Sequence, residues 1–247
     1  MDKISVVSPV YKAYDIIPEL VSRLKHVLDI IGNSYEIILV EDGCPQNSWS
    51  AISEECKKDE RVIGVKLSRN FGQHNAITAG LSHVTGDWVV VMDCDLQDQP
   101  EEIPKLFSKV SEGYKIVYAV RNERQDAFLK RLSSSMFYRF FSYMTDTKQD
   151  ARIANFGIYH KTVIDAILSM RDNIRYFPAM AQWVGFSSIG INVNHAPRSA
   201  GKSSYNWKSL FKLAMVNIIA FSGKPMYLNI RFGLFIVFIS FLIAIYY

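Results

Sequence analysis

Short apolar runs recur along the first half of the chain and constrain its fold more than any other feature. Each run has seven or eight residues, is rich in β-branched side chains, and precedes a longer stretch with apolar positions at helical spacing. Continuous apolar strands that alternate with helices are typical of a mostly parallel sheet covered on both faces. The sequence therefore predicts an α/β fold. The runs are ISVVSPV (4–10), YEIILVED (35–42), RVIGVKL (61–67), DWVVVMD (87–93) and KIVYAVR (115–121).

The stretches between these runs predict helices over 16–31, 48–58, 74–83 and 103–112. In a parallel sheet the carboxyl ends of the strands meet at one edge, and ligands bind there. Five segments lie at the ends of the five runs, and each of them carries at least one charged side chain. We therefore expect a binding site along this edge. The segments are 9–12, 41–43, 68–72, 93–98 and 121–124.

Beyond residue 125 the pattern loosens. We expect a helix over 128–144, a strand over 155–159, a helix over 162–170 and one or two strands within 183–195. A polar loop then leads to a helix over 207–222, whose apolar positions lie at helical spacing beside Trp207, Lys208 and Lys212. This composition favours a helix in the plane of a membrane interface. An ordinary helix facing the core is the alternative.

The run FGLFIVFISFLIAIYY (232–247) has sixteen residues and no charge. A membrane span needs about 20 such residues, so the run predicts either the start of a transmembrane helix or a buried terminal helix. Basic residues before it favour a cytoplasmic location for the upstream chain, and the N-terminus lacks the pattern of a signal peptide. We expect a catalytic domain over 1–205, an interfacial helix over 206–224 and the beginning of a transmembrane segment over 231–247.

Composition excludes two classes of protein. With 49% apolar and 21% charged residues among 247, the chain is not disordered. Its net charge of +4 is mild, and the basic residues gather in the last quarter, so we expect no nucleic-acid partner. The three cysteines (Cys44, Cys56 and Cys94) form no CxxC pair and are expected to be free thiols. Self-association stays open.

Three acids follow the fourth run in VVVMDCDLQDQP (89–100). Asp93 and Asp95 face the same side of an extended segment, whereas Cys94 points into the sheet. Two carboxylates at a strand end suit Mg²⁺ or Mn²⁺, which prefer oxygen ligands. A solvated turn is the alternative. We expect Asp98 to be the cap or turn residue at the entry of the next helix, before Pro100.

Cationic side chains are expected near the same edge. A metal ion together with guanidinium groups suits a diphosphate, because an Arg fork binds phosphate oxygens through two hydrogen bonds. We single out Arg121 and Arg198 from the set. Its members are Arg121, Arg124, Lys130, Arg131, Arg198 and Lys202.

The chain resembles glycosyltransferase family 2, within the group of dolichyl-phosphate mannosyltransferases and bacterial undecaprenyl-phosphate glycosyltransferases. Residues 3–231 follow the order and spacing of the family. The resemblance implies a GT-A fold, a nucleotide-sugar donor expected to be a UDP-sugar, a Mg²⁺ or Mn²⁺ cofactor, hexosyltransferase activity and an acceptor at the membrane. The segments that carry it are SVVSPVYK, EIILVEDG, VKLSRNFGQHNAITAGL, GDWVVVMDCDLQDQPEEIP and RSAGKSSYNWKSLFKLAMVNIIAFSGKP.

The resemblance implies roles for the residues of the donor site. Pro9 and Tyr11 lie where the first loop of the family contacts the nucleoside, and Asp42 matches the acid that recognises the base. Arg69 and Gly72 belong to the loop expected beside the nucleotide.

Further roles concern the diphosphate and the acceptor. Asp93 and Asp95 match the acids for metal and diphosphate, and Gln97 matches the glutamine that joins them as a metal ligand. Arg121 and Arg131 match basic residues near the phosphates and the acceptor. A late loop is implied to close over the site. Its matching residues are Arg198, Gly201, Lys202, Ser203 and Tyr205.

Two positions depart from the family pattern. Where the family commonly has Asp-Asp-Gly-Ser, this chain reads EDGC at 41–44. Polyprenyl-phosphate transferases often carry Gly-Asp-Phe before their late strand, whereas this chain reads ANF at 154–156. Asn155 cannot act as a base, and Asp150 is the nearest carboxylate that could replace it.

The implied reaction is a single displacement at the anomeric carbon with inversion. A hydroxyl acceptor gains about 10²–10⁴-fold from a general base, whereas a phosphate monoester needs none, because it is already largely ionised at neutral pH. Asn155 therefore favours undecaprenyl phosphate over a saccharide hydroxyl of a lipid-linked glycan. A catalytically inactive membrane regulator that binds nucleotides is the remaining alternative, and the pair of acids Asp93 and Asp95 argues against it.

Overall fold

The computed structural model describes residues 2–121, 144, 153–172, 175–194, 196, 215 and 222–247. The chain divides into two compact units, one formed by Met1–Gln125 and Ala151–Lys202 and the other by Asp126–Asp150 and Ser203–Tyr247. The predicted helix over 128–144 lies outside the described residues except for Met144, and so does most of the predicted interfacial helix over 206–224. Both helices stay predictions.

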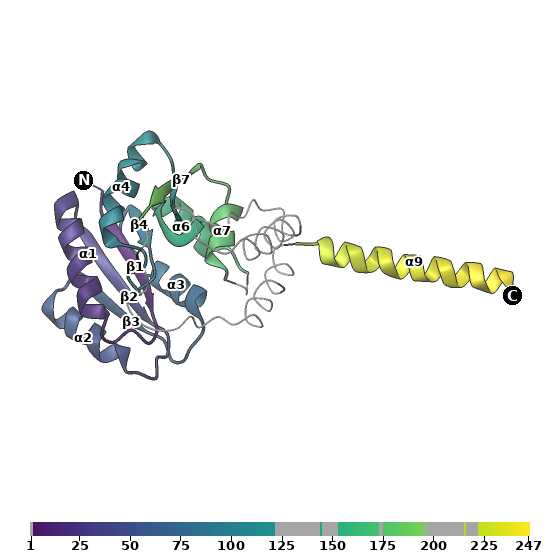
Figure 1. The fold of residues 1–247 in the computed structure, drawn as a ribbon, viewed down its shortest axis with the longest axis horizontal. Helices are drawn as coiled ribbons and strands as arrows, with labels where there is room; N and C mark the ends of the chain where they lie inside the picture. Colours follow the sequence, from purple (N-terminus) through teal and green to yellow (C-terminus); the bar gives the residue numbers. More distant parts are fainter. Residues whose placement is uncertain are drawn as a thin grey trace. The chain divides into compact units, whose positions relative to one another are not determined.

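The described strands of the first unit form one seven-stranded sheet (Figure 1). β6 runs antiparallel to both of its neighbours, whereas every other pair of neighbouring strands is parallel. The prediction of a mostly parallel sheet is confirmed, and the carboxyl ends of the other six strands share one edge. In spatial order the strands are β3 (Val62–Lys66), β2 (Tyr35–Glu41), β1 (Ile4–Val10), β4 (Trp88–Val91), β6 (Ile153–His160), β5 (Ile116–Arg121) and β7 (Ser188–Val193).

Helices cover both faces of this sheet (Figure 1). One layer contains α1 (Ile17–Ile31), α2 (Ser48–Lys58) and α4 (Ile103–Ser108), and the other contains α3 (Gln73–Leu81), α6 (Lys161–Ser169) and α7 (Phe177–Trp183). Every residue of β1, β2 and β4 is buried between the layers. This burial on both sides explains why these strands read as continuous apolar runs without alternation.

The ends of α1 follow local rules of helix formation. Pro18 lies in its first turn, where a missing N–H costs nothing, and Gly32 ends it in the left-handed conformation at φ 79°. The N–H of Gly32 donates to the carbonyl of Leu28 at 3.2 Å. Its buried residues recur at helical spacing, so the helix presents one apolar face to the sheet. They are Ile17, Leu20, Val21, Leu24, Val27 and Leu28.

Two predicted elements differ from the structure, and one observed helix was not predicted. The helix expected over 103–112 is divided into α4 and a 3₁₀ turn over Val110–Glu112. The helix α7 was not predicted, because its seven residues are too few to establish a helical period. The strands expected within 183–195 reduce to β7, since Trp183 belongs to α7.

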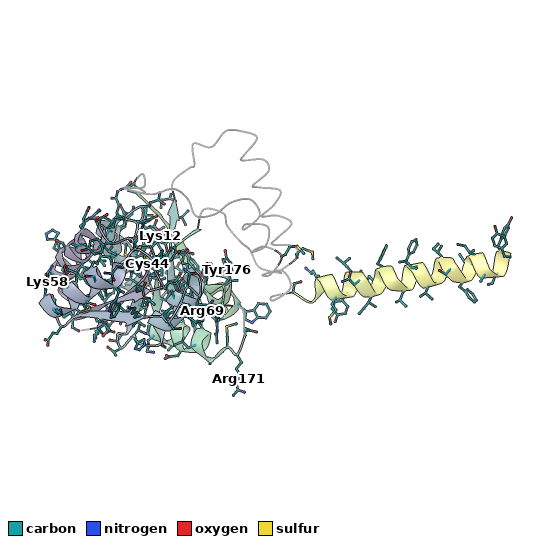
Figure 2. The ribbon with its side chains drawn as sticks, turned by 90° about the horizontal axis from the view of Figure 1, so that it is seen from below. Lys12, Cys44, Lys58, Arg69, Arg171 and Tyr176 are labelled. Atoms are coloured by element: carbon teal, nitrogen blue, oxygen red, sulfur yellow. The ribbon has the colours of Figure 1, made fainter. Side chains whose placement is uncertain are left out.

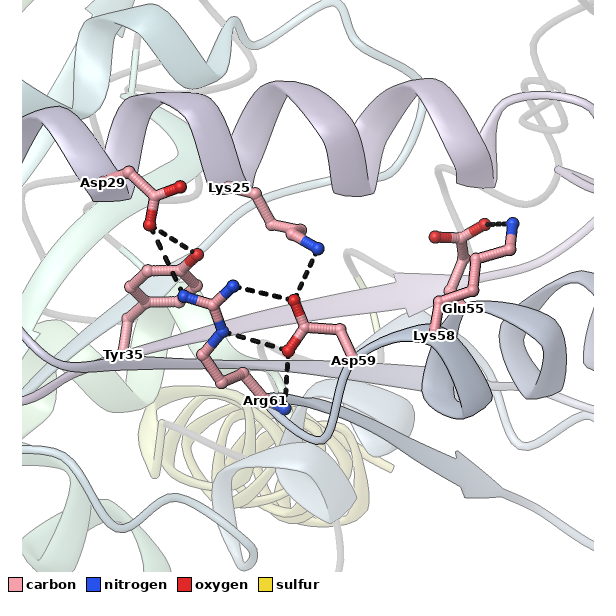
Figure 3. A network of polar contacts seen from close by, with 7 residues as sticks. All are labelled: Lys25, Asp29, Tyr35, Glu55, Lys58, Asp59 and Arg61. Carbon is pink, nitrogen blue, oxygen red and sulfur yellow. Dashed lines mark hydrogen bonds and ion pairs between the residues drawn. The ribbon is translucent and has the colours of Figure 1, made fainter.

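A polar network ties α1 to the amino ends of β2 and β3 (Figure 3). Asp59 accepts hydrogen bonds from the Arg61 guanidinium at 2.8 and 3.0 Å and forms an ion pair with Lys25 at 2.5 Å. These two cations hold the pKa of Asp59 well below its usual range. Burial and a hydrogen bond to Asp29 raise the pKa of Tyr35 to about 12. The network stabilises the edge of the sheet opposite the strand carboxyl ends.

In the second unit, α9 (Lys224–Tyr246) is a single helix of 23 residues. Its window Met226–Tyr246 has a mean hydropathy of 2.3 and none of it is buried, so by length and composition it is a candidate membrane span. At 1.5 Å per residue the helix is about 34 Å long, which exceeds the length predicted from the uncharged run alone. The helix begins earlier because it includes Asn229 and Arg231. A long cationic side chain near a helix end can extend toward the membrane surface.

Candidate active site

The site is built from the segments that follow β1, β2, β3 and β4 at the shared edge of the sheet. Figure 2 labels Lys12, Cys44 and Arg69 among them, and Tyr176 from the segment before α7. The structure describes Pro9, Tyr11, Asp42, Arg69, Gly72, Asp93, Asp95 and Gln97 of the predicted site, and the backbone of Arg121. The other predicted site residues lie outside the described part of the chain. These are Arg131, Asp150, Arg198, Gly201, Lys202, Ser203 and Tyr205.

Asp42 joins the turn after β2 to the loop over 68–72. Its side chain is 3% exposed, and its two carboxylate oxygens accept the backbone N–H groups of Phe71 at 2.7 Å and Gly72 at 2.9 Å. Its carbonyl accepts the side-chain amide of Asn70 at 3.0 Å. Asp42 therefore fixes the loop that carries Arg69. Its recognition of a base stays a prediction.

Gly43 makes this close approach sterically feasible. A Cβ atom there would lie 2.2 Å from the backbone nitrogen of Asn70, and the residue has a φ of 58°. Both features favour glycine, because a side chain would meet backbone atoms that cannot move aside. Above this contact the exposed Arg69 guanidinium lies 4.5 Å from the centroid of the Phe71 ring, at cation–π distance.

Two cysteine sulfurs hold the loop after β1. The N–H of Lys12 donates to Cys44 Sγ at 3.1 Å, and the N–H of Tyr11 donates to the sulfur of Cys94. Pro9 belongs to β1, lies opposite Val40 of β2 and is buried, so it precedes the exposed part of this loop. Tyr11 itself is 39% exposed. The two thiols therefore position the backbone of the predicted nucleoside loop.

Cys44 and Cys94 differ in their environment. Burial raises the pKa of Cys44, but hydrogen bonds from Ser48, Gln46 and Lys12 outweigh it and the pKa is lowered. Burial raises the pKa of Cys94 to about 12, and the neighbouring Asp93 adds to the effect. Cys44 is therefore the more reactive thiol of this pair.

The acidic segment after β4 alternates between buried and partly exposed residues. Cys94, Leu96 and Asp98 are buried, whereas Asp93, Asp95 and Gln97 are partly exposed. The prediction that Cys94 points into the sheet is confirmed by its place in the hydrophobic core. Asp95 Oδ1 accepts the N–H of Gln97 at 3.2 Å, which keeps the turn closed.

Asp98 is not the N-cap residue of the next helical turn, because the 3₁₀ turn over Pro100–Glu102 has Gln99 in that place. Its role as a turn residue stays a prediction. Asp98 is 1% exposed. Its carboxylate is buried inside the fold, so Asp98 is not one of the accessible acids at this edge of the sheet.

Gln73, which sequence reasoning missed, touches Asp93. Its Nε2 atom donates to Asp93 Oδ1 at 2.5 Å. The sequence signal was present, because Gln73 directly follows Gly72 and opens a helix at the predicted edge. Nothing in the spacing showed that its side chain reaches across to the next strand.

Two later segments of the chain lie beside the segment that carries Asp93 and Asp95. The N–H of Ala196 donates to the carbonyl of Gln97 at 3.0 Å, so the predicted late loop starts next to this segment. In β6, Gly157 pairs with Val91 of β4 and Ile158 with Val90. Asn155 therefore lies two residues before the last pair, at the end of β6 that is next to the carboxyl end of β4.

His74 is a structural residue in this environment. Its ring packs edge-on against Tyr176 with centroids 4.7 Å apart, and burial lowers its pKa to about 4. It is therefore neutral at pH 7 and joins the start of α3 to the segment before α7.

Asp93 and Asp95 fit a divalent ion whose remaining ligands come from elsewhere. Within the described ranges no group of three or more His, Cys, Asp or Glu is arranged to hold a metal. Two partly exposed carboxylates and the nearby Gln97 suit Mg²⁺ or Mn²⁺, which commonly complete their coordination with water and substrate phosphates.

Comparison with known proteins identifies the family of the chain. The model of a family described as glycosyl transferase family 2 matches residues 5–175. The chain is 36% identical to an undecaprenyl-phosphate 4-deoxy-4-formamido-L-arabinose transferase of Enterobacter sp. (strain 638), over 98% of this chain and 75% of that protein. It is equally similar, at 36%, to the protein of the same name from Klebsiella pneumoniae, over 97% of this chain and 73% of that one.

Solved structures show the same fold. Glucosyl-3-phosphoglycerate synthase from Mycobacterium tuberculosis, in complex with Mg²⁺ and uridine diphosphate, superposes with a TM-score of 0.64 at 12% identity over 90% of this chain and 80% of that one. Mannosyl-3-phosphoglycerate synthase from Rubrobacter xylanophilus gives 0.61 at 13% identity, over 93% and 75%. At these identities the likeness concerns the fold alone, and the predicted GT-A architecture is confirmed.

Proposed function

Because the chain belongs to glycosyltransferase family 2, we propose that it transfers a sugar from a nucleoside-diphosphate sugar to undecaprenyl phosphate at the membrane. The observation that carries the proposal is the pair Asp93 and Asp95 at the edge where the loops fixed by Asp42 and Cys44 meet. The names of the two relatives supply the acceptor class. The retention of both acids argues against an inactive regulator.

The sugar is proposed from the same relatives. Their names specify 4-deoxy-4-formamido-L-arabinose, which is a pentose derivative. The sequence had led us to expect a hexose, so we now propose a UDP-linked amino-pentose of this class as the first donor to test. Arg69, Phe71 and Tyr11 are among the exposed residues of the loops that would meet the nucleoside.

The donor is bound and oriented by three groups of residues. The first loop and the loop over 68–72 would contact the nucleoside, and Asp93, Asp95 and Gln97 would hold the metal. A bound Mg²⁺ or Mn²⁺ stabilises the charge that develops on the departing diphosphate. Arg121, whose backbone ends β5, and Arg198 are the proposed cations for the diphosphate. The acceptor then displaces the nucleoside diphosphate in one step with inversion.

The acceptor side follows from Asn155. An amide at this position cannot take a proton from a hydroxyl, but a phosphate acceptor brings its own negative oxygen. Arg131 and Lys202 are the proposed cations for that phosphate, while Ser203 and Tyr205 complete the late loop. Asp150 becomes the base only if the acceptor is a saccharide hydroxyl.

Membrane attachment is proposed through α9. A helix about 34 Å long matches the roughly 30 Å hydrocarbon thickness of a bilayer. Lys224 and Arg231 near its amino end favour a cytoplasmic position for that end, and hence for the catalytic unit. A nucleotide-sugar donor made in the cytoplasm would be accessible there.

Lipid labelling tests the proposal. Membranes that contain the full-length protein are incubated with undecaprenyl phosphate, Mg²⁺ or Mn²⁺, and labelled UDP-sugars that include UDP-4-deoxy-4-formamido-L-arabinose. We expect labelled lipid with one donor, its loss with EDTA, and its loss in Asp93→Asn. Asp165→Asn, an exposed residue of α6 that pairs with Lys161 at 2.5 Å, is the matched control. Metal-dependent UDP binding without labelled lipid from any donor would overturn the proposal in favour of a regulator.

A further inference from the structure

Gln73 connects the loop that follows β3 to the acid at the end of β4. It is the first residue of α3, and its side-chain Nε2 atom donates to Asp93 Oδ1 at 2.5 Å, across 20 positions of the chain. A hydrogen bond from an amide to an ionised carboxylate is stronger than one between neutral groups. The contact therefore fixes the orientation of the Asp93 carboxylate.

The backbone of Gln73 is itself rigidly placed. The preceding Gly72 donates its N–H to Asp42 Oδ2 at 2.9 Å and has a φ of 90°, which favours glycine. A continuous chain of contacts therefore runs from Asp42 through Gly72 and Gln73 to Asp93. This chain spans the edge from the predicted base contact to the predicted metal ligand.

Packing of α3 against the sheet supports the same placement. Ala76, Ile77, Gly80 and Leu81 are buried. A Cβ atom on Gly80 would lie 2.5 Å from Val7 Cγ1, so the helix sits directly on β1. Because α3 cannot move away without losing this contact, the amide of Gln73 stays at a fixed distance from β4.

The chemistry of the amide suits a metal-supporting residue. A lysine or arginine at this place would neutralise Asp93 and compete with the cation. A neutral N–H group orients one oxygen and leaves the negative charge of the carboxylate in place. Partners of this kind typically change metal affinity by about 10–100-fold when they are removed.

We propose that Gln73 is a positioning residue for the metal and diphosphate site, which acts by orienting the Asp93 carboxylate. The inference rests on the proposed function insofar as Asp93 binds the metal of a nucleotide-sugar donor. Gln73 then contributes to the metal-dependent part of the affinity for the nucleotide-sugar donor. It contributes nothing to the part of this affinity that is independent of metal.

Binding of UDP to the full-length protein, measured by titration calorimetry with MnCl₂ and again with EDTA, tests this role. Gln73→Ala removes the side-chain amide that donates the hydrogen bond to Asp93. Gln73→Asn keeps an amide but is one methylene too short to reach Asp93. We expect both to weaken UDP binding in Mn²⁺ by about 10-fold or more, with binding in EDTA unchanged. Asn75→Ala is the matched control, because it removes an amide contact of 2.8 Å to Phe71 in the same turn.

The outcomes separate the inference from the proposed function. The wild-type protein is expected to bind UDP better with Mn²⁺ than with EDTA. If Gln73→Ala then binds UDP in Mn²⁺ with the same affinity as the wild type, the role of Gln73 is overturned while the transferase proposal stands. An equal loss in Gln73→Ala and Asn75→Ala also overturns it, since the effect would then be general damage to the turn. If the wild type shows no Mn²⁺-dependent UDP binding at all, donor binding itself is refuted and the inference with it. Circular dichroism melting confirms that each variant is folded.

Discussion

The backbone N–H of Lys12 donates to the sulfur of Cys44 at 3.1 Å. This contact joins the loop after β1 to the turn after β2, and the same sulfur accepts the N–H of Gln46 at 3.3 Å and lies 3.2 Å from Ser48 Oγ. A thiol with several donors around it is stabilised as a thiolate. The position where the family commonly has serine therefore carries a reactive group in this chain.

Alkylation is expected to modify Cys44 first. Because its pKa is lowered while that of Cys94 is raised to about 12 and that of Cys56 is raised by burial, Cys44 holds the largest thiolate fraction at pH 7. N-ethylmaleimide followed by peptide mass spectrometry should show labelling at Cys44, with a rate that rises with pH and levels off at a lower pH than for a model thiol. UDP should slow the reaction. Faster labelling of Cys56 would contradict this assignment.

Gly43→Ala should damage both stability and donor binding. The added Cβ would lie 2.2 Å from the Asn70 nitrogen, and overpacking of this kind costs about 1–3 kcal/mol. We expect the free energy of unfolding, measured with urea, to fall by that amount. UDP affinity should also fall by at least about tenfold, which corresponds to a loss of about 1.4 kcal/mol of binding free energy. Gly32→Ala is the control, because Gly32 has a φ of 79° but no atom within 4 Å of its Cβ position. It should lose stability while keeping UDP affinity.

Asn155→Asp discriminates between the two acceptor classes. The new carboxylate adds a negative charge at the end of β6 that is next to the carboxyl end of β4, and an unfavourable like-charge contact with an anionic acceptor costs several kcal/mol. Transfer to undecaprenyl phosphate should therefore fall at least about tenfold in kcat/KM, whereas Asn155→Ser should fall less. Unchanged or increased transfer to undecaprenyl phosphate in Asn155→Asp would contradict this repulsion, and increased transfer to a lipid-linked saccharide would mean that a base was missing and that the acceptor is a hydroxyl.

The network around Asp59 should make stability depend on acidic pH. Its folded-state pKa is depressed by Arg61 and then by Lys25, so its contribution is present above the unfolded pKa of about 3.9 and is lost as pH falls through the folded value. Asp59→Asn should lower the unfolding free energy at pH 7 by about 1 kcal/mol, a small value because Arg61 is exposed to solvent. The loss of stability between pH 5 and pH 2 should be shallower in the variant. Equal slopes in urea melts across that range would exclude the network as the cause.

A charge in the middle of α9 should impair membrane insertion. Ile236→Arg places a cation near the centre of Met226–Tyr246, where it costs about 2.5–3.5 kcal/mol. We expect a smaller fraction of the protein in carbonate-washed membranes. Tyr247→Arg, at the end of the helix, should behave like the wild type. Unchanged membrane retention of Ile236→Arg would contradict a transmembrane role for α9.

Much of the fold follows from local sequence rules. The bounds of α2 and β1 agree with the predicted ranges residue by residue, because buried runs and helical spacing are local signals. Cys94 also points into the sheet as its alternation with Asp93 and Asp95 predicts. These features depend only on which residues alternate along a strand.

The remaining features depend on pairing between distant segments. The contact of Gln73 with Asp93 requires the order β2-β1-β4, and the place of Asn155 requires the antiparallel register of β6 against β4. Asp98 was misjudged as a cap because burial of its carboxylate depends on surrounding elements and leaves no local signature. The start of α9 was placed too late because a single arginine interrupts an apolar count without ending a helix.

The antiparallel direction of β6 has a consequence for how the chain can vary. β5 leaves the sheet at Arg121 and β6 enters it at Ile153, and Val120 pairs directly with Ile153. The connection over 122–152 therefore begins and ends on neighbouring strands, at the edge of the sheet that holds the carboxyl ends of the parallel strands. A segment anchored in this way can be lengthened, shortened or exchanged between relatives without altering the strand order. The sheet with Asp93 and Asp95 can stay constant while the connection that begins and ends at this edge varies.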